Sequence, residues 1–200
     1  MAKRAKIALI VVDVQNDFCP GGALAVPDGD EVVTPLNKLI QHARVNGWLV
    51  VITRDWHPEE TSHFDTWPVH CVRDTRGAEF HSQLDVAGAW LVSKGIKPGE
   101  DAYSAFDGHA LKTGQSLLRL LRDYELNCVY VGGLATDYCV KATAIDAVTH
   151  EFKTLLLADA CRAMDIKPDD GADAIKDMQA AGVILTTTQE VINGRRPAHH

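Results

Sequence analysis

The sequence lacks the features that would assign it to a membrane or to a nucleic acid. No apolar run approaches the ~20 residues that cross a bilayer. Lys and Arg are scattered, and the formal net charge is −7. A binder of the phosphate backbone needs a concentrated basic face instead. We therefore expect neither a membrane nor nucleic acid among the partners of this protein.

Cysteines are few, and the sequence shows no export signal. The five cysteines are an odd number without the spacing of a disulfide scaffold, which is typical of a reducing cytosol. Residues Met1–Lys6 carry charge, but the apolar run after them ends at Asp13 without a small-residue cleavage site. This does not resemble a signal peptide, so we expect a cytoplasmic protein.

The length and composition predict one globular domain, residues 1–200, with 46% hydrophobic and 24% charged residues. Apolar, β-branched runs predict six strands, at Ile7–Val12, Trp48–Thr53, Ala89–Val92, Cys128–Val131, Thr154–Ala158 and Val183–Thr186. Helical segments lie between most of them, at Glu31–Asn46, Ser116–Tyr124, Asp137–His150 and Pro168–Ala181. This alternation predicts a Rossmann-like three-layer α/β/α sandwich whose mainly parallel sheet has the order 3-2-1-4-5-6.

A glycine-rich phosphate loop is absent after the first predicted strand. The residues there are Asp-Val-Gln-Asn-Asp-Phe, positions 13–18, and a carboxylate at the strand end disfavours a bound pyrophosphate. We therefore do not expect a dinucleotide. The alternation also breaks at about residues 56–87, a long segment rich in His, Trp, Pro and Asp. Long irregular loops in compact domains are often functional, and we interpret this one as a metal-binding insertion.

Reactive side chains stand at the predicted carboxyl ends of the strands, where open α/β sheets place their sites. Cys139 follows a Gly-Gly turn and begins a helix, whose dipole would lower its pKa and favour the thiolate. An ammonium at Lys94 would do the same, and Asp13 would accept the thiol proton. Two simpler interpretations stay open: a small buried hydrophobe at Cys139, as Cys128 suggests, and a cap or hydrogen-bond partner at Asp13.

A second group of residues suggests a metal. Asp55, His57, His63 and His70 lie within sixteen positions. One carboxylate with two or three imidazoles suits zinc, iron(II) or manganese, and the spacing does not choose among them. Cys71 is a rival ligand, or a core residue beside His70.

Five motifs together resemble the nicotinamidase/pyrazinamidase branch of the isochorismatase-like hydrolases, over nearly the whole chain. They are Asp13–Phe18 with Gly21-Gly22, Asp55–Pro58, Trp67–Cys71, Lys94-Gly95 and Gly133–Val140. The resemblance implies hydrolysis of nicotinamide, and also of pyrazinamide, to the acid and ammonia through a thioester. It implies one divalent metal ion, and the chain is compatible with a homo-oligomer.

The resemblance also implies a role for each matching residue. The catalytic triad would be Asp13, Lys94 and Cys139. The metal ligands would be Asp55, His57 and His70. A cis peptide between Leu134 and Ala135 would aim the N–H groups of Ala135 and Cys139 into an oxyanion hole. The residues around the pyridine ring would be Phe18, Trp67 and Tyr103, for which core packing is the alternative.

His63 stands where many relatives have Ser and where the mycobacterial type of pyrazinamidase has His. We predict that it is a fourth protein ligand; the alternative is that it faces solvent while Ser62 or Glu60 acts beside the metal. Two other enzyme classes share the expected fold. Isochorismatase-type vinyl-ether hydrolases lack the cysteine and the Asp-x-His motif, and carbamoyl amide hydrolases lack the metal loop. A non-catalytic metal-binding module would need no triad.

Overall fold

The computed structural model describes residues 6–194, and at its centre lies one mainly parallel sheet. Within those residues the sheet has seven strands in the order β4-β3-β2-β1-β5-β6-β7. Only β3 and β4 pair in the antiparallel direction. The strands are β1 (Ile7–Val12), β2 (Leu49–Asp55), β3 (Trp90–Lys94), β4 (His109–Ala110), β5 (Cys128–Leu134), β6 (Lys153–Arg162) and β7 (Ile184–Thr186).

The six predicted strands are all present, and their relative order is the predicted one. The first and fourth of them, β1 and β5, are hydrogen-bonded neighbours, as expected at a switch point. The prediction missed β4, an edge strand of two residues, because two residues are too few to form a recognisable pattern. It also ended the fifth strand too early, since β6 continues to Arg162.

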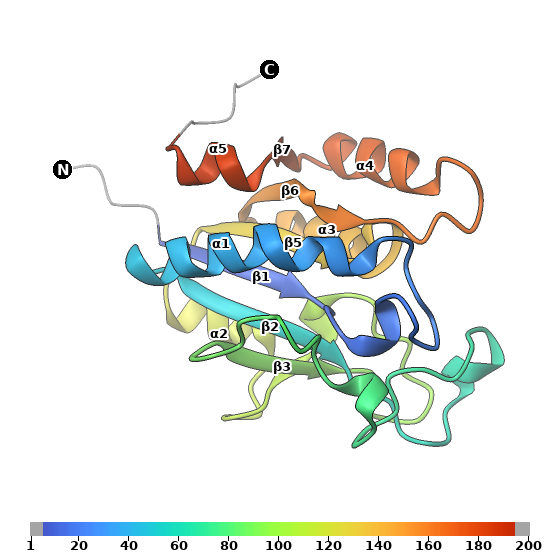
Figure 1. Cartoon of the computed structure of the whole chain (residues 1–200). Helices are drawn as coiled ribbons and strands as arrows, with labels where there is room; N and C mark the ends of the chain where they lie inside the picture. Colours follow the sequence, from blue (N-terminus) through green and yellow to red (C-terminus); the bar gives the residue numbers. More distant parts are fainter. Residues whose placement is uncertain (1–5, 195–200) are drawn as a thin grey trace.

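Helices cover both faces of the sheet (Figure 1). On one face lie α1 (Val33–Val45) and the short α5 (Thr188–Ile192), which sequence analysis missed. The other face is covered by α2 (Leu117–Asp123), α3 (Lys141–Thr149) and α4 (Asp170–Ala180). The predicted helix at 137–150 differs at its start, where Thr136–Val140 form a π-helical turn, η6, that leads into α3.

Strand β1 shows why the first predicted strand is almost continuously apolar. Its side chains alternate between the two faces, and both faces are buried: Leu9 and Val11 contact the core under α1, while Ala8, Ile10 and Val12 contact the core under α2 and α3. A strand between two helical layers has no solvent-facing side, so every position favours an apolar residue.

The first part of the segment at 56–87 lies beyond the carboxyl ends of the strands, and its last residues run back along α1 toward the start of β3 (Figure 1). The regular structure of the segment consists of short 3-10 turns, including η3 (Ser62–Asp65) and η4 (Arg76–Ala78). The buried Gln15 and the half-buried Asp17 tie it to the sheet. The Gln15 amide donates to the carbonyl oxygens of Asp55 and Ala78 at 2.8 and 2.9 Å, and Asp17 accepts from the Cys71 N–H at 2.7 Å. The loop is therefore held against the site.

Within residues 6–194, none of the helices combines the length and apolar character that a bilayer crossing requires. Of the segment Met1–Lys6, residues 1–5 lie outside the described residues.

Gly133 lies where β5 closely approaches Val12 of β1, and a substitution there tests this close approach. It has φ +129°, and a Cβ there would lie 2.1 Å from the Val12 carbonyl oxygen. We expect Gly133→Ala to lower the free energy of unfolding by well over the ~1 kcal/mol typical of single substitutions. Gly114→Ala is the control, because Gly114 has φ +71° with nothing within 4 Å and costs only about 1–2 kcal/mol of backbone strain. Equal losses in urea unfolding would contradict a steric role for Gly133.

Candidate active site and metal centre

The predicted catalytic side chains come together because parallel strands end at the same edge. Asp13 directly follows β1, Lys94 is the last residue of β3, and Cys139 lies in η6 after β5. All three are buried. Asp55 ends β2 between them and joins the same cluster.

Lys94 is the centre of this cluster. Its ammonium Nζ lies 2.9 Å from Asp13 Oδ2, 2.5 Å from Asp55 Oδ1 and 3.4 Å from Cys139 Sγ. The side chain is fully buried, so the ammonium has two carboxylates as partners in place of water. The other oxygen of Asp13, Oδ1, accepts a hydrogen bond from the Thr53 hydroxyl at 2.6 Å. Thr53 therefore fixes the carboxylate and leaves Oδ2 directed at the lysine.

Burial and charge set the protonation preferences of the cluster. Burial alone would lower the pKa of Lys94, but Asp13 and Asp55 outweigh it and raise that pKa well above its usual value. Burial alone would raise the pKa of Asp55, but Lys94 and His57 outweigh it and lower that pKa. At Asp13 burial prevails over Lys94 and raises the pKa. A carboxylate with a raised pKa is a better proton acceptor.

Cys139 differs from the sequence expectation. Burial raises the pKa of its thiol well above the usual value, although Lys94 opposes this. The prediction of a lowered pKa was wrong because it considered the helix terminus and the lysine but not the loss of solvent around Sγ. A raised pKa favours the thiol over the thiolate, so Cys139 would need a base to act as a nucleophile. Asp13 is the candidate base, because one of its carboxylate oxygens lies within 4.8 Å of the Cys139 sulfur.

The turn that presents Cys139 has two unusual features. The Leu134–Ala135 peptide is cis, as the resemblance implies, and Thr136–Val140 are π-helical; π-turns are rare and frequent at functional sites. Asp137 secures the turn from outside by accepting the backbone N–H groups of Met164 and Asp165 at 2.9 and 3.0 Å. Ala135 and Cys139 both border the cavity described below; their oxyanion-hole role stays a prediction.

The histidines of the loop form a second cluster beside the first. One ring nitrogen from each of His57, His63 and His70 lies within 4.8 Å of the others, and the second oxygen of Asp55, Oδ2, is 3.8 Å from His57 Nε2. Among the described residues, His57 Nε2 is buried without a hydrogen-bond partner, a costly state that a cation would relieve. Burial also lowers the pKa of His70, which favours the neutral imidazole that binds metals. These residues fit a divalent metal ion.

Two residues had alternative interpretations: Cys71 as a rival metal ligand, and His63 as a side chain that faces solvent. Cys71 is fully buried in the apolar core under α1, and burial raises the pKa of its thiol well above the usual value. His63 is also buried, with 3% of its side chain exposed, so it does not face solvent. Within the described residues, all five cysteines are free and buried, as the odd count and spacing suggest.

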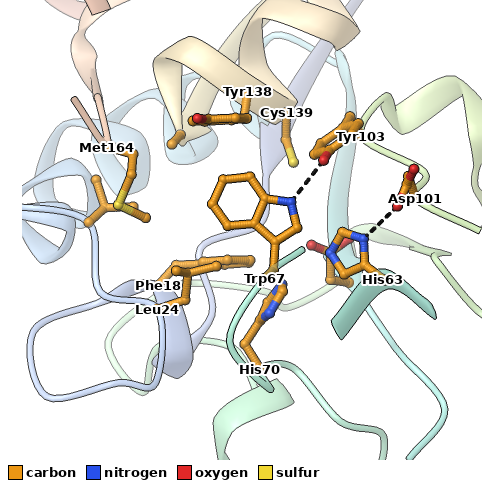
Figure 2. A pocket seen from close by; sticks show the side chains of 13 residues that line it. Phe18, Leu24, His63, Trp67, His70, Asp101, Tyr103, Tyr138, Cys139 and Met164 are labelled. Carbon is orange, nitrogen blue, oxygen red and sulfur yellow. Dashed lines mark hydrogen bonds and ion pairs between the residues drawn. The ribbon is translucent and has the colours of Figure 1, made fainter. Parts of the chain in front are cut away.

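A pocket of about 410 Å³, its open mouth included, lies above both clusters. Figure 2 shows the Trp67 indole at its centre, with Cys139 on one side and Phe18 on the other. The Trp67 ring N–H donates to the Tyr103 hydroxyl at 2.9 Å. All three aromatic residues predicted around the ring thus line the pocket. The remaining lining residues were not predicted from the sequence; they are Leu24, Val26, Asp101, Tyr138 and Met164.

Comparison with known proteins places this fold and site in a family. The Isochorismatase domain model matches residues 7–190. The nicotinamidase of Escherichia coli is 41% identical, over 90% of this chain and 94% of that protein. The nicotinamidase/pyrazinamidase of Mycobacterium tuberculosis is 39% identical, over 89% and 97%. The crystal structure of Pyrococcus horikoshii pyrazinamidase in complex with zinc superposes with a TM-score of 0.82 at 43% identity, covering 91% and 99% of the two chains.

These similarities extend over the whole sheet and the site, so they concern the fold and not one motif. A buried cysteine beside a lysine and an aspartate has the side chains that an activated nucleophile needs. The chain is a member of the isochorismatase family. Within that family it is similar to nicotinamidases and pyrazinamidases.

Removal of the buried ammonium tests the electrostatic cluster. We expect Lys94→Met to lower the free energy of unfolding by about 3–5 kcal/mol, because breaking a buried ion pair leaves uncompensated charge. Denaturant unfolding at neutral pH measures this. Lys176→Met is the control, since Lys176 pairs with Asp173 at the surface and contributes little. A Lys94→Met protein as stable as wild type would mean that the carboxylates do not depend on the lysine.

Proposed function

We propose that this chain is a nicotinamidase, which hydrolyses nicotinamide to nicotinic acid and ammonia with Cys139 as the nucleophile. The observation that carries the proposal is the position of Cys139 Sγ, 3.4 Å from the Lys94 ammonium and on the wall of a pocket that His63 and His70 also line. The similarity to nicotinamidases and pyrazinamidases supports the substrate class. Pyrazinamide carries the same carboxamide on a related ring, so we propose it as a second substrate.

We propose Asp55, His57, His63 and His70 as the ligands of one divalent metal ion. Three imidazoles and a carboxylate suit zinc, iron(II) or manganese, and the similar Pyrococcus protein was crystallised with zinc. Bound there, the cation supplies a Lewis acid for the ring nitrogen of the substrate. Phe18, Trp67 and Tyr103 enclose the ring and exclude water.

The chemistry begins with proton transfer from Cys139 to Asp13, which the raised pKa of Asp13 favours. Sulfur then forms a bond to the amide carbon, and the negative charge on the carbonyl oxygen is stabilised by the N–H groups of Ala135 and Cys139, at about 2.7–4 kcal/mol per donor. As the C–N bond breaks, Asp13 returns the proton to the leaving nitrogen, and ammonia departs. The acid is left as a thioester on Cys139.

Water completes the reaction by the same route in reverse. Asp13, again a carboxylate, takes a proton from the water while the water oxygen attacks the thioester carbon. The C–S bond breaks, the sulfur regains a proton from Asp13, and nicotinic acid leaves. Lys94 keeps its charge throughout and stabilises both the carboxylate and the transient thiolate.

We also propose that residues 1–200 form a single domain with a metal-binding insertion at about 56–87, and that the protein is cytoplasmic. The free, buried cysteines support a reducing compartment. A homo-oligomer stays a prediction.

Substitution of the nucleophile tests the function directly. We expect Cys139→Ala to abolish ammonia release from nicotinamide and to keep the fold and the metal content, because a covalent route has no second nucleophile. Cys128→Ala is the control, since Cys128 lies in β5 away from the pocket and its replacement should leave turnover near wild type. More than a few per cent of activity in Cys139→Ala would favour attack by metal-bound water. Absence of turnover in the wild type would favour another amide substrate or a non-catalytic metal-binding module.

The ligand role of His63 is tested by metal affinity. We expect His63→Ala to weaken zinc binding by well over tenfold, comparable to His57→Ala, because each removes one of the clustered imidazoles. Chelator competition measures this, with His109→Ala as control, since His109 is exposed on β4. A His63→Ala protein that holds zinc as tightly as the control would restrict the ligands to Asp55, His57 and His70.

A further inference from the structure

The three clustered histidines share a hydrogen-bond pattern at Nδ1. His57 Nδ1 lies 3.2 Å from the Gly95 carbonyl oxygen, and His70 Nδ1 lies 2.7 Å from the Pro68 carbonyl oxygen. A carbonyl oxygen only accepts, so each Nδ1 carries the hydrogen and each Nε2 keeps its lone pair for a metal. For these two histidines the backbone itself selects the tautomer and the orientation of the ring.

His63 obtains the same arrangement from a side chain. Its Nδ1 lies 2.9 Å from Asp101 Oδ1, and Figure 2 shows the carboxylate meeting the edge of the imidazole. The His63 ring also stacks on His57, with centroids 4.5 Å apart and an interplanar angle of 22°. His63 is thus the one member of this cluster whose Nδ1 partner can be changed by substitution.

The loop that carries Asp101 is connected to η3 by hydrogen bonds. The Thr61 hydroxyl accepts from the His63 N–H and from the Gly99 N–H, both at 3.3 Å, and so connects the two segments. Lys97 and Glu100 close the turn just before Asp101 with an ion pair of 3.0 Å. The Asp101 side chain is 66% exposed, whereas His63 is 3% exposed. An exposed carboxylate therefore stands on the outer side of a buried imidazole.

We propose that Asp101 is a positioning residue for the metal centre, which holds His63 as the Nδ1–H tautomer and turns its Nε2 lone pair toward His57 and His70. The inference rests on the proposed metal site and deepens it. Carboxylates that accept from a ligating histidine fix the ring and raise its basicity, and their loss typically weakens metal binding by about 10–100-fold. Asp101 thus acts on the metal through His63 and takes no part in the bond changes at Cys139.

Zinc retention by the full-length, zinc-loaded protein tests this. The measurement is the chelator concentration that removes half of the zinc, for wild type and for variants Asp101→Ala, Asp101→Asn and Glu100→Gln. We expect a loss of affinity of about 10–100-fold for Asp101→Ala. Asp101→Asn should lose less, because its amide oxygen still accepts from Nδ1–H. Glu100→Gln removes the same charge one residue earlier but keeps a side-chain oxygen that accepts from the Lys97 N–H, so the turn is kept and the zinc affinity should stay at the wild-type level.

The route through His63 is tested in a second background. Asp101→Ala should cause no further loss of zinc affinity when added to His63→Ala, because the residue on which it acts is already gone. The proposal is overturned if Asp101→Ala keeps zinc within about twofold, if Glu100→Gln loses as much, or if the loss persists in the His63→Ala background. Ammonia release by the wild type is measured separately, so failure of the nicotinamidase assignment is distinguishable from failure of this inference.

Discussion

The buried ion pairs of Lys94 join the two side-chain clusters of the proposed active site. Its ammonium contacts Asp13 and Asp55 and approaches Cys139. Without it, two carboxylates would share a dry strand edge, where like charges strongly raise a pKa. With it, Asp55 stays ionised next to the histidines, whereas at Asp13 burial outweighs the lysine and the pKa stays raised next to the thiol. The proposed acid–base group and the proposed metal ligand thus share one partner, but only at Asp13 does burial prevail over that partner's effect on the pKa.

Much of this arrangement could be predicted from the sequence because it depends on strand order. Apolar runs locate the strands, and the rule that sites lie at their carboxyl ends brings together Asp13, Lys94 and Cys139. The histidines of the loop were recognisable by their density and by their start at a strand end. The resemblance to a family added roles, including the cis peptide at Leu134–Ala135 that the structure confirms.

What escaped prediction depends on packing and not on local pattern. Periodicity gives no measure of how completely solvent leaves Cys139, so the direction of its pKa was wrong. Met164 and Asp101 reach the pocket from loops far along the chain, and neither belongs to a motif. Tyr138 is adjacent to Cys139 in a motif already recognised, and only its direction toward the pocket required the structure. β4 and α5 were too short to produce a periodic signal.

The polar residues around the site show how a buried centre keeps a unique geometry. The side-chain amide of Gln15 makes two hydrogen bonds of 2.8 Å to the backbone of Asp55. Its nitrogen donates to the carbonyl oxygen, and its oxygen accepts from the N–H. Thr53 holds Asp13, and Asp137 holds the segment at Met164. Gln15 and Thr53 are fully buried, and each both donates and accepts hydrogen bonds within the protein. Displacing either would leave a buried polar atom without a partner. The rigidity that positions the reacting atoms therefore comes from the cost of breaking this network, and not from the strands alone.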